Sequence, residues 1–375
     1  MEIDRAYFRY RSNYVGAIAS ELAAPALRAW ARVVAPGAPT EPRDWRRLVI
    51  LGSTHIGDVL YRTASLPYLK RALPNCQITY VTSPLTAELL TTNPSVDDVL
   101  PIAESGADWR RRAARELRAR AFDAALCTDN IAYQHDLILA TRAGIPARVG
   151  FVHKGFSALV TRPVPGPPRL PAPAYMRAIV AHVGDLAPTW DLTPVLVTTA
   201  EDERRAEAVW RELGLGQAAL TIACAITLRQ TVTATWPPDQ FLAALAEVNR
   251  RADIEVVLCG SAADAPLLDA TARQAPFRCR VAAGLLTLRA LGAFVRRCHL
   301  LLGMDSGPRH IANAVGTPVV FVRSLKATRI EAGVYCANET DVAPADEWLP
   351  FEAQRAALAR LDPRAVADVV LMRAA

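Results

Sequence analysis

The alternation of two hydrophobic periods along the chain constrains its fold more than any other feature. Between residues 47 and 322, short runs rich in β-branched residues and leucine alternate with segments whose apolar residues recur at helical spacing. Such alternation is typical of parallel α/β layers, in which each helix returns the chain to the start of the next strand. We therefore predict an α/β protein built on doubly wound parallel sheets.

The same periodicity predicts the individual elements. In the first half we expect strands at 48–51, 77–81, 99–102, 124–128 and 148–151, and helices at 59–72, 85–90, 109–120 and 133–143. In the second half we expect strands at 220–225, 255–258, 280–283, 300–303 and 319–322, and helices at 239–249, 264–274, 287–296 and 307–314. A helical tail follows at 348–372, with a break at Pro363.

A proline-rich stretch separates the two halves. Six prolines lie between residues 162 and 173, a density that excludes a helix or a central strand and indicates an interdomain connection or exposed loop. A chain of 375 residues is also long for one hydrophobic core. We predict four parts: a helical segment and linker at 1–40, Rossmann-like domains at 41–185 and 186–345, and a helical tail at 346–375.

The composition excludes several classes of protein. Hydrophobic residues make up 51% of the chain and charged residues 21%, as in globular proteins, and no apolar run reaches the ~18 residues that suggest a membrane-spanning helix. The seven cysteines are scattered and include no C-x-x-C pair. We therefore expect reduced cysteines, no structural zinc and a cytoplasmic location.

Two basic or amphipathic segments indicate possible partners. The net charge of +6 comes largely from arginine, with clusters at 110–112, 115–120 and 250–251. Such a surface attracts nucleic acid, anionic lipid or phosphorylated substrates, although a solvated helix face explains it equally well. No basic motif interleaved with aromatic residues favours nucleic acid. Residues 14–34 carry apolar residues on one helix face, which favours docking on the protein body over lying on a membrane.

The junction at residues 300–310 is the strongest candidate for a ligand site. A continuous apolar strand runs into the sequence MDSGPRH at 304–310, where a helix begins. The N-terminus of such a helix presents unpaired backbone N–H groups and a partial positive charge, which suit a diphosphate. Asp305 either caps this helix or binds ligand hydroxyls, and Arg309 and His310 add cationic or donor groups.

A second strand-to-helix loop follows the first strand, with the sequence GSTHIGD at 52–58. It is neither a G-x-G-x-x-G motif nor a P-loop, which disfavours a hydride-transfer enzyme. Its carboxylate, Asp58, is equally consistent with a charge that complements the helix dipole and with a catalytic base. His55 either assists or simply lines the loop, together with Thr54 and Gly57.

Two further positions are open to both structural and functional interpretations. Asp264 follows a predicted strand and either caps a helix or accepts hydrogen bonds from a ribose. The sequence WPPD at 236–239 opens a helix, and its tryptophan is better explained by packing than by ligand binding.

Taken together, these motifs resemble glycosyltransferase family 9, the ADP-heptose glycosyltransferases of bacterial lipopolysaccharide synthesis. The resemblance covers residues 47–325 and is strongest at DSGPRH, 305–310, followed by AVGTP at 314–318. Supporting segments are IGDVL at 56–60, NPSVDDV at 93–99, FDAAL at 122–126, ARVGF at 147–151, WPP at 236–238 and LTL at 286–288. It implies the GT-B fold, in which two Rossmann-like domains face a central cleft.

The resemblance also implies the reaction and the roles of residues. The reaction would be an inverting, metal-independent transfer of heptose from ADP-heptose, with no cofactor, and Asp58 would be the general base. Asp305 would hold heptose hydroxyls, while Ser306, Gly307, Pro308, Arg309 and His310 would surround the departing diphosphate. Asp264 falls near the ribose position of the family, and Leu286 near its adenine pocket.

Two departures from the family pattern concern the phosphates. Ala234 occupies the position two residues before Trp-Pro-Pro where many members have a lysine, and the usual Phe-Gly-Pro-Thr after the late strand is replaced by RSLK at 323–326. Because a diphosphate leaving group needs a counter-charge, we expect Arg229 or Lys326 to replace the missing cation.

The acceptor is less constrained than the donor, because variable loops of the first domain bind it. The family's usual acceptor is a sugar of the lipopolysaccharide inner core, so the expected partners are a nucleotide sugar and a glycolipid, with peripheral contact at the inner face of the membrane. Alternatives are a small natural product or a protein as acceptor, and a non-catalytic nucleotide-sugar-binding protein on a transferase scaffold.

Overall fold

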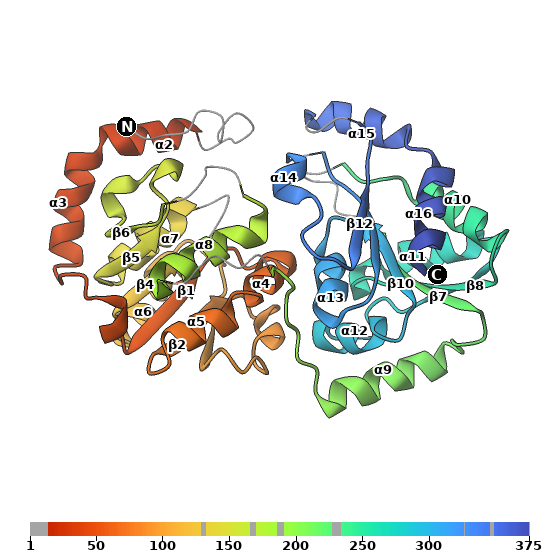
Figure 1. Ribbon diagram of the computed structural model, residues 1–375, viewed down its shortest axis with the longest axis horizontal. Coiled ribbons are helices and arrows are strands. Elements are labelled where there is room, and N and C mark those ends of the chain that lie inside the picture. Colours follow the sequence, from red (N-terminus) through yellow and green to blue (C-terminus); the bar gives the residue numbers. More distant parts are fainter. Residues whose placement is uncertain are drawn as a thin grey trace. The chain divides into compact units, whose positions relative to one another are not determined.

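The computed structural model describes residues 14–128, 133–165, 170–185, 191–226, 234–325, 327–345 and 349–374. The chain divides into two compact units, Met1–Leu192 and Thr193–Ala375, each built around its own six-stranded sheet (Figure 1). Among the described residues, no helix is both long enough and apolar enough to cross a membrane.

The sheet of the first unit is entirely parallel and has the order β3-β2-β1-β4-β5-β6. Its strands are β1 (Arg47–Leu51), β2 (Gln77–Thr82), β3 (Asp98–Pro101), β4 (Ala124–Cys127), β5 (Ala147–Gly150) and β6 (Arg162–Pro163). The central strands are buried along nearly their whole length, because helices cover both faces of a parallel sheet. This explains why they are continuous apolar runs in the sequence.

The helices of this unit are α4 (Ile56–Thr63), α5 (Leu66–Ala72), α6 (Trp109–Ala119), α7 (Tyr133–Arg142) and α8 (Ala172–Gly184). The single helix predicted at 59–72 is divided in two at Ala64 and Ser65. Pro67 lies in the first turn of α5, where its missing N–H is tolerated, whereas in a continuous helix it would remove an internal hydrogen bond. The helix predicted at 85–90 is only a short 3-10 turn, η2 (Ala87–Leu89).

The proline-rich stretch is more ordered than predicted. Arg162 and Pro163 form the edge strand β6, and α8 begins at Ala172 with a proline in its first turn. Both positions accept proline, since an edge strand and a first helical turn each contain N–H groups without a required partner. The expectation that this density of proline excludes a helix is therefore wrong at its C-terminal end.

The N-terminal segment lies against the first unit as α2 (Tyr14–Leu22) and α3 (Ala24–Val34). Ala31 is buried in a core cluster with residues of α6 and α7. Ser20 Oγ accepts a hydrogen bond from the backbone N–H of Phe156 at 2.8 Å, and Glu21 accepts hydrogen bonds from the backbone and hydroxyl of Ser157. In Figure 1, α3 forms one outer flank of this unit.

The sheet of the second unit repeats the first. Its strands are β7 (Leu220–Ala225), β8 (Ile254–Leu258), β9 (Arg278–Val281), β10 (Leu300–Met304), β11 (Val319–Val322) and β12 (Glu339–Val342), in the order β12-β11-β10-β7-β8-β9. Counted from the first strand of each unit, both sheets have the order 3-2-1-4-5-6 of dinucleotide-binding folds. β9 lies two residues earlier than predicted, and the polar edge strand β12 was not predicted.

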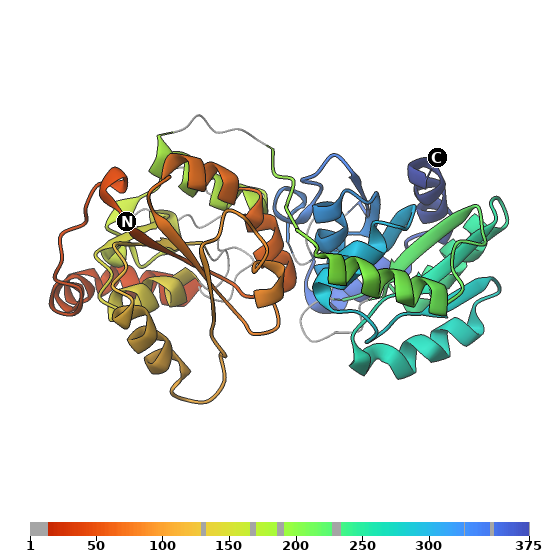
Figure 2. The same ribbon diagram turned by 90° about the horizontal axis from the view of Figure 1, so that it is seen from below.

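The helices of the second unit are α9 (Ala200–Glu212), α10 (Pro238–Asn249), α11 (Ala265–Gln274), α12 (Leu288–Val295), α13 (Gly307–Val315), α14 (Arg329–Ala332), α15 (Phe351–Ala359) and α16 (Pro363–Ala374). Helix α9, which was not predicted, packs on α12 (Figure 2). The C-terminal helix α16 packs on α10 and adds Val366 and Val370 to the core of this unit.

Each sheet contains one switch point, which is the position where the strand order reverses. In the first unit it lies between β1 and β4, and in the second between β7 and β10. Helices on the two sides of such a point turn to opposite faces of the sheet, which leaves room for a ligand beyond the carboxyl ends of the strands. The loops after β1 and β10 are the two segments singled out from the sequence.

Candidate functional site

Asp58 lies in the first turn of α4, directly after the loop that follows β1. Its side chain is 27% exposed. Tyr61 Oη donates a hydrogen bond to Oδ1 at 2.7 Å, and Ser53 Oγ donates to Oδ2. His55 Nδ1 is 3.6 Å from Oδ2, and the imidazole is 87% exposed. The carboxylate is therefore held on both oxygens while one side of the group faces solvent.

These contacts determine the charge of Asp58. Desolvation raises the pKa of the carboxyl, but the nearby imidazole of His55, the positive charge of Arg62 and the hydroxyls of Ser53 and Tyr61 together lower it by more. The pKa of Asp58 is therefore held well below its ordinary value, and the group is a carboxylate at neutral pH. An anion at this position can accept a hydrogen bond from a hydroxyl group of a ligand.

The loop that carries Ser53 rests on a buried arginine. Arg62 is fully buried, and its guanidinium donates to the carbonyl of Ser53 at 2.7 Å and to the carbonyl of Thr128 at 3.4 Å. Gly52 is required beside it, because a Cβ there would lie 2.8 Å from Arg62 Cζ and closer still to the hydroxyl of Thr128. The guanidinium thus joins the ends of β1 and β4 across the switch point.

The other residues predicted in the loop at 52–58, namely Thr54, His55 and Gly57, lie close to Asp58 in the chain. The carbonyl of Thr54 accepts a hydrogen bond from Thr86 Oγ1 at 3.1 Å, which ties the loop to the segment after β2. His55 is the N-cap of α4, and Gly57 lies in its first turn. The structure therefore brings together all the residues predicted in this loop.

Asp305 occupies the corresponding place in the second unit, directly after β10. Its side chain is 13% exposed, and Oδ1 accepts a hydrogen bond from Arg309 Nη1 at 2.8 Å. The guanidinium of Arg309 is 1% exposed and makes two parallel hydrogen bonds to Glu339 of β12, at 2.7 and 2.9 Å. It also lies over the ring of Phe321, 3.5 Å from the centroid. Asp305 is thus positioned by a buried ion pair.

The role predicted for the side chain of Arg309 is corrected by this geometry. All its guanidinium nitrogens have protein partners, including the carbonyls of Ala332 and Gly333. Glu339 is held in turn by the amide of Asn313 and the backbone N–H of Tyr335. Burial raises the pKa of Glu339, but the hydrogen bonds from Arg309 and the positive charge of Arg309 lower this pKa by more than burial raises it. The pair therefore stays ionised. The guanidinium of Arg309 is therefore directed toward protein groups, among them Asp305.

The helix terminus at α13 is the other predicted feature of this site. Ser306 is the N-cap and makes no side-chain capping hydrogen bond, Pro308 has no N–H, and the N–H of Arg309 donates to the carbonyl of Ser306. Fewer N–H groups therefore face outward than the sequence indicates, and those of Ser306 and Gly307 remain. His310 is nearly buried, with Nδ1 2.5 Å from the hydroxyl of Tyr335 and Nε2 3.8 Å from Asp305.

Asp264 and Leu286 belong to the loops that follow β8 and β9. Asp264 Oδ2 accepts hydrogen bonds from the backbone N–H and the hydroxyl of Ser261, so this oxygen caps the turn η5 (Ala262–Asp264). The two loops are joined by a hydrogen bond from Gly284 N–H to the carbonyl of Gly260. They continue along the same sheet edge as the loop with Asp305, since β10, β7, β8 and β9 are neighbours.

The predicted cations Arg229 and Lys326 lie outside the described residues. Ala234 is buried beside Trp236, which is fully buried and packs on Phe241 in the core, as its sequence context indicates. No group of three or more His, Cys, Asp or Glu side chains suited to a metal ion occurs within the described ranges. Glu339 and Tyr61 were missed from the sequence; only Tyr61, three residues after Asp58 on one helix face, had a detectable signal.

The chain is similar in sequence to known glycosyltransferases. The sequence model of glycosyltransferase family 9 (heptosyltransferase) matches residues 110–323, more than half of the chain. Lipopolysaccharide heptosyltransferase 3 of Escherichia coli is 26% identical over 288 residues, which cover 70% of this chain and 78% of that protein. Lipopolysaccharide core heptosyltransferase OpsX of Haemophilus influenzae is 23% identical over 284 residues, covering 73% and 78%.

Solved structures match in fold. A glycosyl transferase family 9 protein of Veillonella parvula has a TM-score of 0.73 and 21% identity, covering 90% of this chain and 99% of that one. The ADP-heptose lps heptosyltransferase II of Escherichia coli has a TM-score of 0.66 and 19% identity, covering 88% and 98%. These matches confirm the predicted GT-B class of fold. The chain therefore belongs to glycosyltransferase family 9, the heptosyltransferase family, and is a glycosyltransferase.

Proposed function

We propose that this glycosyltransferase moves a heptose from ADP-heptose to a hydroxyl group of the lipopolysaccharide inner core, with inversion at the anomeric carbon and without a metal ion. Both sequence relatives are named as lipopolysaccharide heptosyltransferases, and one structural neighbour is named as an ADP-heptose enzyme. The observation that carries the proposal is the partly exposed Asp58 carboxylate, which hydrogen bonds keep ionised at a switch point.

Asp58 is the proposed general base. An acceptor hydroxyl would take the place of Ser53 Oγ as the donor to Oδ2, which directs the proton to be removed toward the carboxylate. This proton would pass to Oδ2 while the acceptor oxygen attacks the anomeric carbon and the ADP group leaves. Tyr61 remains on Oδ1 and keeps the group oriented.

The second unit is the proposed donor site. Asp305, which a buried arginine positions, would accept hydrogen bonds from heptose hydroxyls. The N–H groups of Ser306 and Gly307 and the positive end of α13 would stabilise the diphosphate as it leaves, with His310 beside them. The loops of Asp264 and Leu286 lie farther along the same sheet edge, where the nucleoside would extend.

Incubating the protein with ADP-heptose and candidate acceptors tests this function through the release of ADP. We expect release with an inner-core acceptor and inverted anomeric configuration in the product by NMR. A small natural product or a protein that supports faster release would replace the acceptor in the proposal. Tight ADP-heptose binding without turnover on any acceptor would instead indicate a non-catalytic binding protein.

Metal independence is part of the same test. One structural neighbour at a TM-score of 0.52 is named as an iron-containing heptosyltransferase, so the protein should be assayed before and after treatment with a chelator and analysed for bound metal. We expect unchanged ADP release. Loss of activity that added iron restores would overturn metal independence without affecting the proposed donor.

The counter-charge for the diphosphate is proposed to come from Arg229 or Lys326. Arg229→Ala and Lys326→Ala, singly and together, should raise the Kd for ADP measured by calorimetry. Arg273→Ala, on the exposed surface of α11, is the control for a lost positive charge. Unchanged ADP binding and turnover in the double variant would exclude both residues.

The proposed location is the cytoplasm, at the inner face of the membrane where a glycolipid acceptor is accessible. All seven cysteines are free thiols in the structure, as expected in a reducing compartment. Fractionation of cells that produce the protein, with and without high salt, would test this location.

A further inference from the structure

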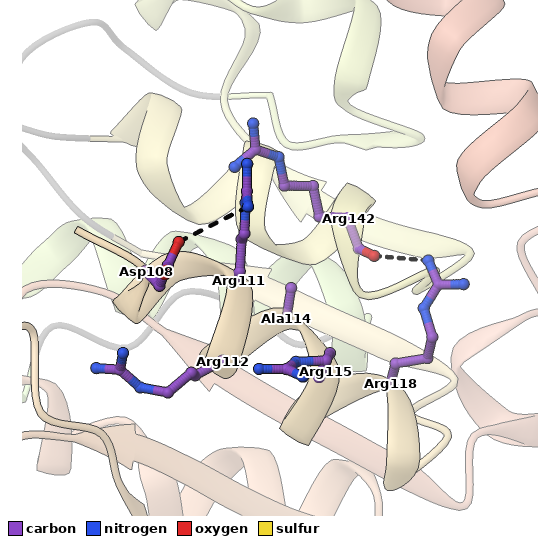
Figure 3. A pocket seen from close by; sticks show the side chains of 7 residues that line it. All are labelled: Asp108, Arg111, Arg112, Ala114, Arg115, Arg118 and Arg142. Atoms are coloured by element: carbon purple, nitrogen blue, oxygen red, sulfur yellow. Dashed lines mark hydrogen bonds and ion pairs between the residues drawn. The ribbon is translucent and has the colours of Figure 1, made fainter. Parts of the chain in front are cut away.

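An arginine-lined hollow covers the outer face of α6 in the first unit. It has a volume of about 780 Å³. Figure 3 shows its lining, in which one carboxylate and one alanine accompany five arginines: Asp108, Arg111, Arg112, Ala114, Arg115, Arg118 and Arg142. Arg142 comes from α7, and the other residues come from α6 and the residue that precedes it.

The spacing of these arginines is unfavourable for the helix itself. Arg111, Arg115 and Arg118 follow one another at intervals of four and three residues, so their charges lie along one ridge of α6. Like charges at these spacings repel each other and destabilise a helix. Asp108, which lines the hollow, pairs with the exposed Arg111, whereas Glu116 does not line it and pairs with Arg120. An anionic partner would relieve the repulsion among the arginines of this surface.

Little of this charge is neutralised by the protein. Arg118 donates to the carbonyl of Arg142 at 2.7 Å and Arg112 to the carbonyl of Ser105 at 2.8 Å, which fixes their direction without cancelling their charge. Arg111 is 3.7 Å from Asp108, with both side chains mostly exposed. Within the described part of the chain, Arg115 has neither a hydrogen bond nor an ion pair.

Apolar side chains border the basic surface. A second, shallower hollow of about 310 Å³ shares Arg118 and is lined also by Val34 and Pro36, at the end of α3. Val33, which precedes Val34 in the chain, is 80% exposed. Basic side chains beside exposed aliphatic ones are typical of surfaces that lie on a bilayer, where the cations meet lipid phosphates and the apolar groups enter the interface.

We propose that this arginine surface, formed by α6, Arg142 of α7 and the end of α3, docks the enzyme on the surface of an anionic phospholipid bilayer. The inference rests on the proposed function, since a membrane glycolipid acceptor gives the docking its purpose. Nucleic acid is the other large polyanion. However, Val33 at the border is aliphatic, and the Trp109 ring of α6 is already covered by Arg110, whose guanidinium carbon is 4.5 Å from the ring centroid, so neither provides an open aromatic platform for stacking on bases.

The arginine surface runs along the side of the first sheet, parallel to its strands. Helix α6 begins after the carboxyl end of β3, and in a parallel sheet this is the edge at which β1 ends and the Asp58 loop begins. The eleven residues of α6 extend ~16 Å back from that edge. Arg111 therefore lies nearer this edge, whereas Arg118 and Arg142, in the last turns of α6 and α7, lie toward the edge at which the strands begin.

Vesicle sedimentation of the full-length protein, without donor or acceptor, tests the docking directly. We expect binding to vesicles that contain phosphatidylglycerol, weak binding to phosphatidylcholine alone, and loss of binding at high salt. The variant Arg111→Ala/Arg115→Ala/Arg118→Ala should bind on the order of 100-fold more weakly, since each arginine near an anionic surface changes binding about fivefold. Val33→Ser should weaken the binding further, by a smaller factor.

A matched control removes the same charge elsewhere. Arg204→Ala/Arg273→Ala/Arg355→Ala changes exposed arginines on three helices of the second unit and should leave vesicle binding within a few-fold of the wild type. Circular dichroism should show that both variants are folded. Because the assay needs no turnover, its result is independent of the proposed donor and acceptor.

Three outcomes would overturn the proposal. The first is equal binding to neutral and anionic vesicles, and the second is unchanged binding of the α6 variant. The third is that single-stranded RNA or inorganic diphosphate binds the protein more tightly than the vesicles do and loses this affinity in the α6 variant. The third result would assign the arginine surface to nucleic acid or to a soluble phosphate compound.

Discussion

The two switch points of this protein hold their carboxylates in opposite ways. Asp58 is kept ionised by the exposed imidazole of His55, the positive charge of Arg62 and the hydroxyls of Ser53 and Tyr61, and its side chain remains 27% exposed. Asp305 is held by the guanidinium of Arg309, which is itself buried and paired with Glu339. A substrate hydroxyl can replace the serine hydroxyl at Asp58, whereas the buried ion pair that holds Asp305 resists displacement. This difference supports the proposed roles, in which Asp58 reacts with the acceptor and Asp305 binds the donor.

The largest effect should come from Asp58→Asn. If Asp58 is the base, kcat should fall by about 10²–10⁴-fold because the amide cannot take a proton, while the Kd for ADP-heptose changes little. ADP release and calorimetry measure the two quantities. Asp305→Asn is the counterpart, for which we expect mainly weaker donor binding. Loss of donor binding in Asp58→Asn, with kcat preserved, would reverse the two roles.

Breaking the buried pair should produce the next largest effect, on stability. Glu339→Gln removes one of the two carboxylate partners of the buried Arg309 and leaves it only Asp305 among the carboxylates it contacts in the described structure, so it should lower the free energy of unfolding by about 3 kcal/mol in urea titrations. The exposed pair of Glu207 and Arg211 provides the control, since Glu207→Gln should cost less than about 0.5 kcal/mol.

The pH dependence of the free energy of unfolding tests whether the lost stability comes from the ionised pair of Glu339 and Arg309. The pKa of Glu339 is lowered in the folded protein, so its stabilisation is present above the pKa of an unfolded glutamate and is lost as the pH falls through the folded value. Glu339→Gln should remove that dependence. A variant as stable as the wild type would mean that the pair does not hold the site rigidly.

A smaller loss of stability is expected at the loop of the first unit. Gly52→Ala places a Cβ 2.8 Å from Arg62 Cζ and should cost about 2 kcal/mol through overpacking, with lower kcat because the Ser53 carbonyl moves. Gly16→Ala, a helical position where a Cβ meets nothing within 4 Å, should be neutral or slightly stabilising. Equal behaviour of the two variants in thermal unfolding would contradict the close packing at Gly52.

The smallest effect should be a shift in pH dependence. Tyr61→Phe removes the hydrogen bond to Asp58 Oδ1, so the pKa of Asp58 should rise. The acid limb of kcat/KM should then move upward by about one pH unit, since a hydrogen bond to a charged group contributes about 1.5 kcal/mol. Activity at neutral pH should persist. A limb that does not move would show that the limb does not report on Asp58.

Strand and helix types were predictable wherever a segment is buried on both faces. The strands predicted at 220–225 and 319–322 coincide with β7 and β11, because a buried parallel strand is continuously apolar. The edge strands β6 and β12 were missed, since they are short and partly exposed. Helix α9 was also missed, although the capping box of Thr199 and Asp202 marks its start.

In the candidate site, the residues marked by a local sequence pattern were predictable, and the partners from distant segments were not. Asp58 and Asp305 were identified because each follows a predicted strand at a strand-to-helix turn, which is a local feature of the sequence. The partner of Arg309 was not predictable, because Glu339 is thirty residues away in a polar edge strand with no hydrophobic pattern. The same contact changed the interpretation of Arg309 from a ligand for phosphate to a positioning residue.

The sequence by itself determined the family, the alternation of strands and helices, and the two acidic loops, since all of these depend on residues close together in the chain. Only the tertiary structure decided which charges are available to a substrate. Long side chains such as Arg62 and Arg309 choose partners that the fold brings near, and burial then sets the strength of each interaction. For this reason Arg309 of the DSGPRH motif is buried in the protein, while arginines of α6 such as Arg111 remain exposed.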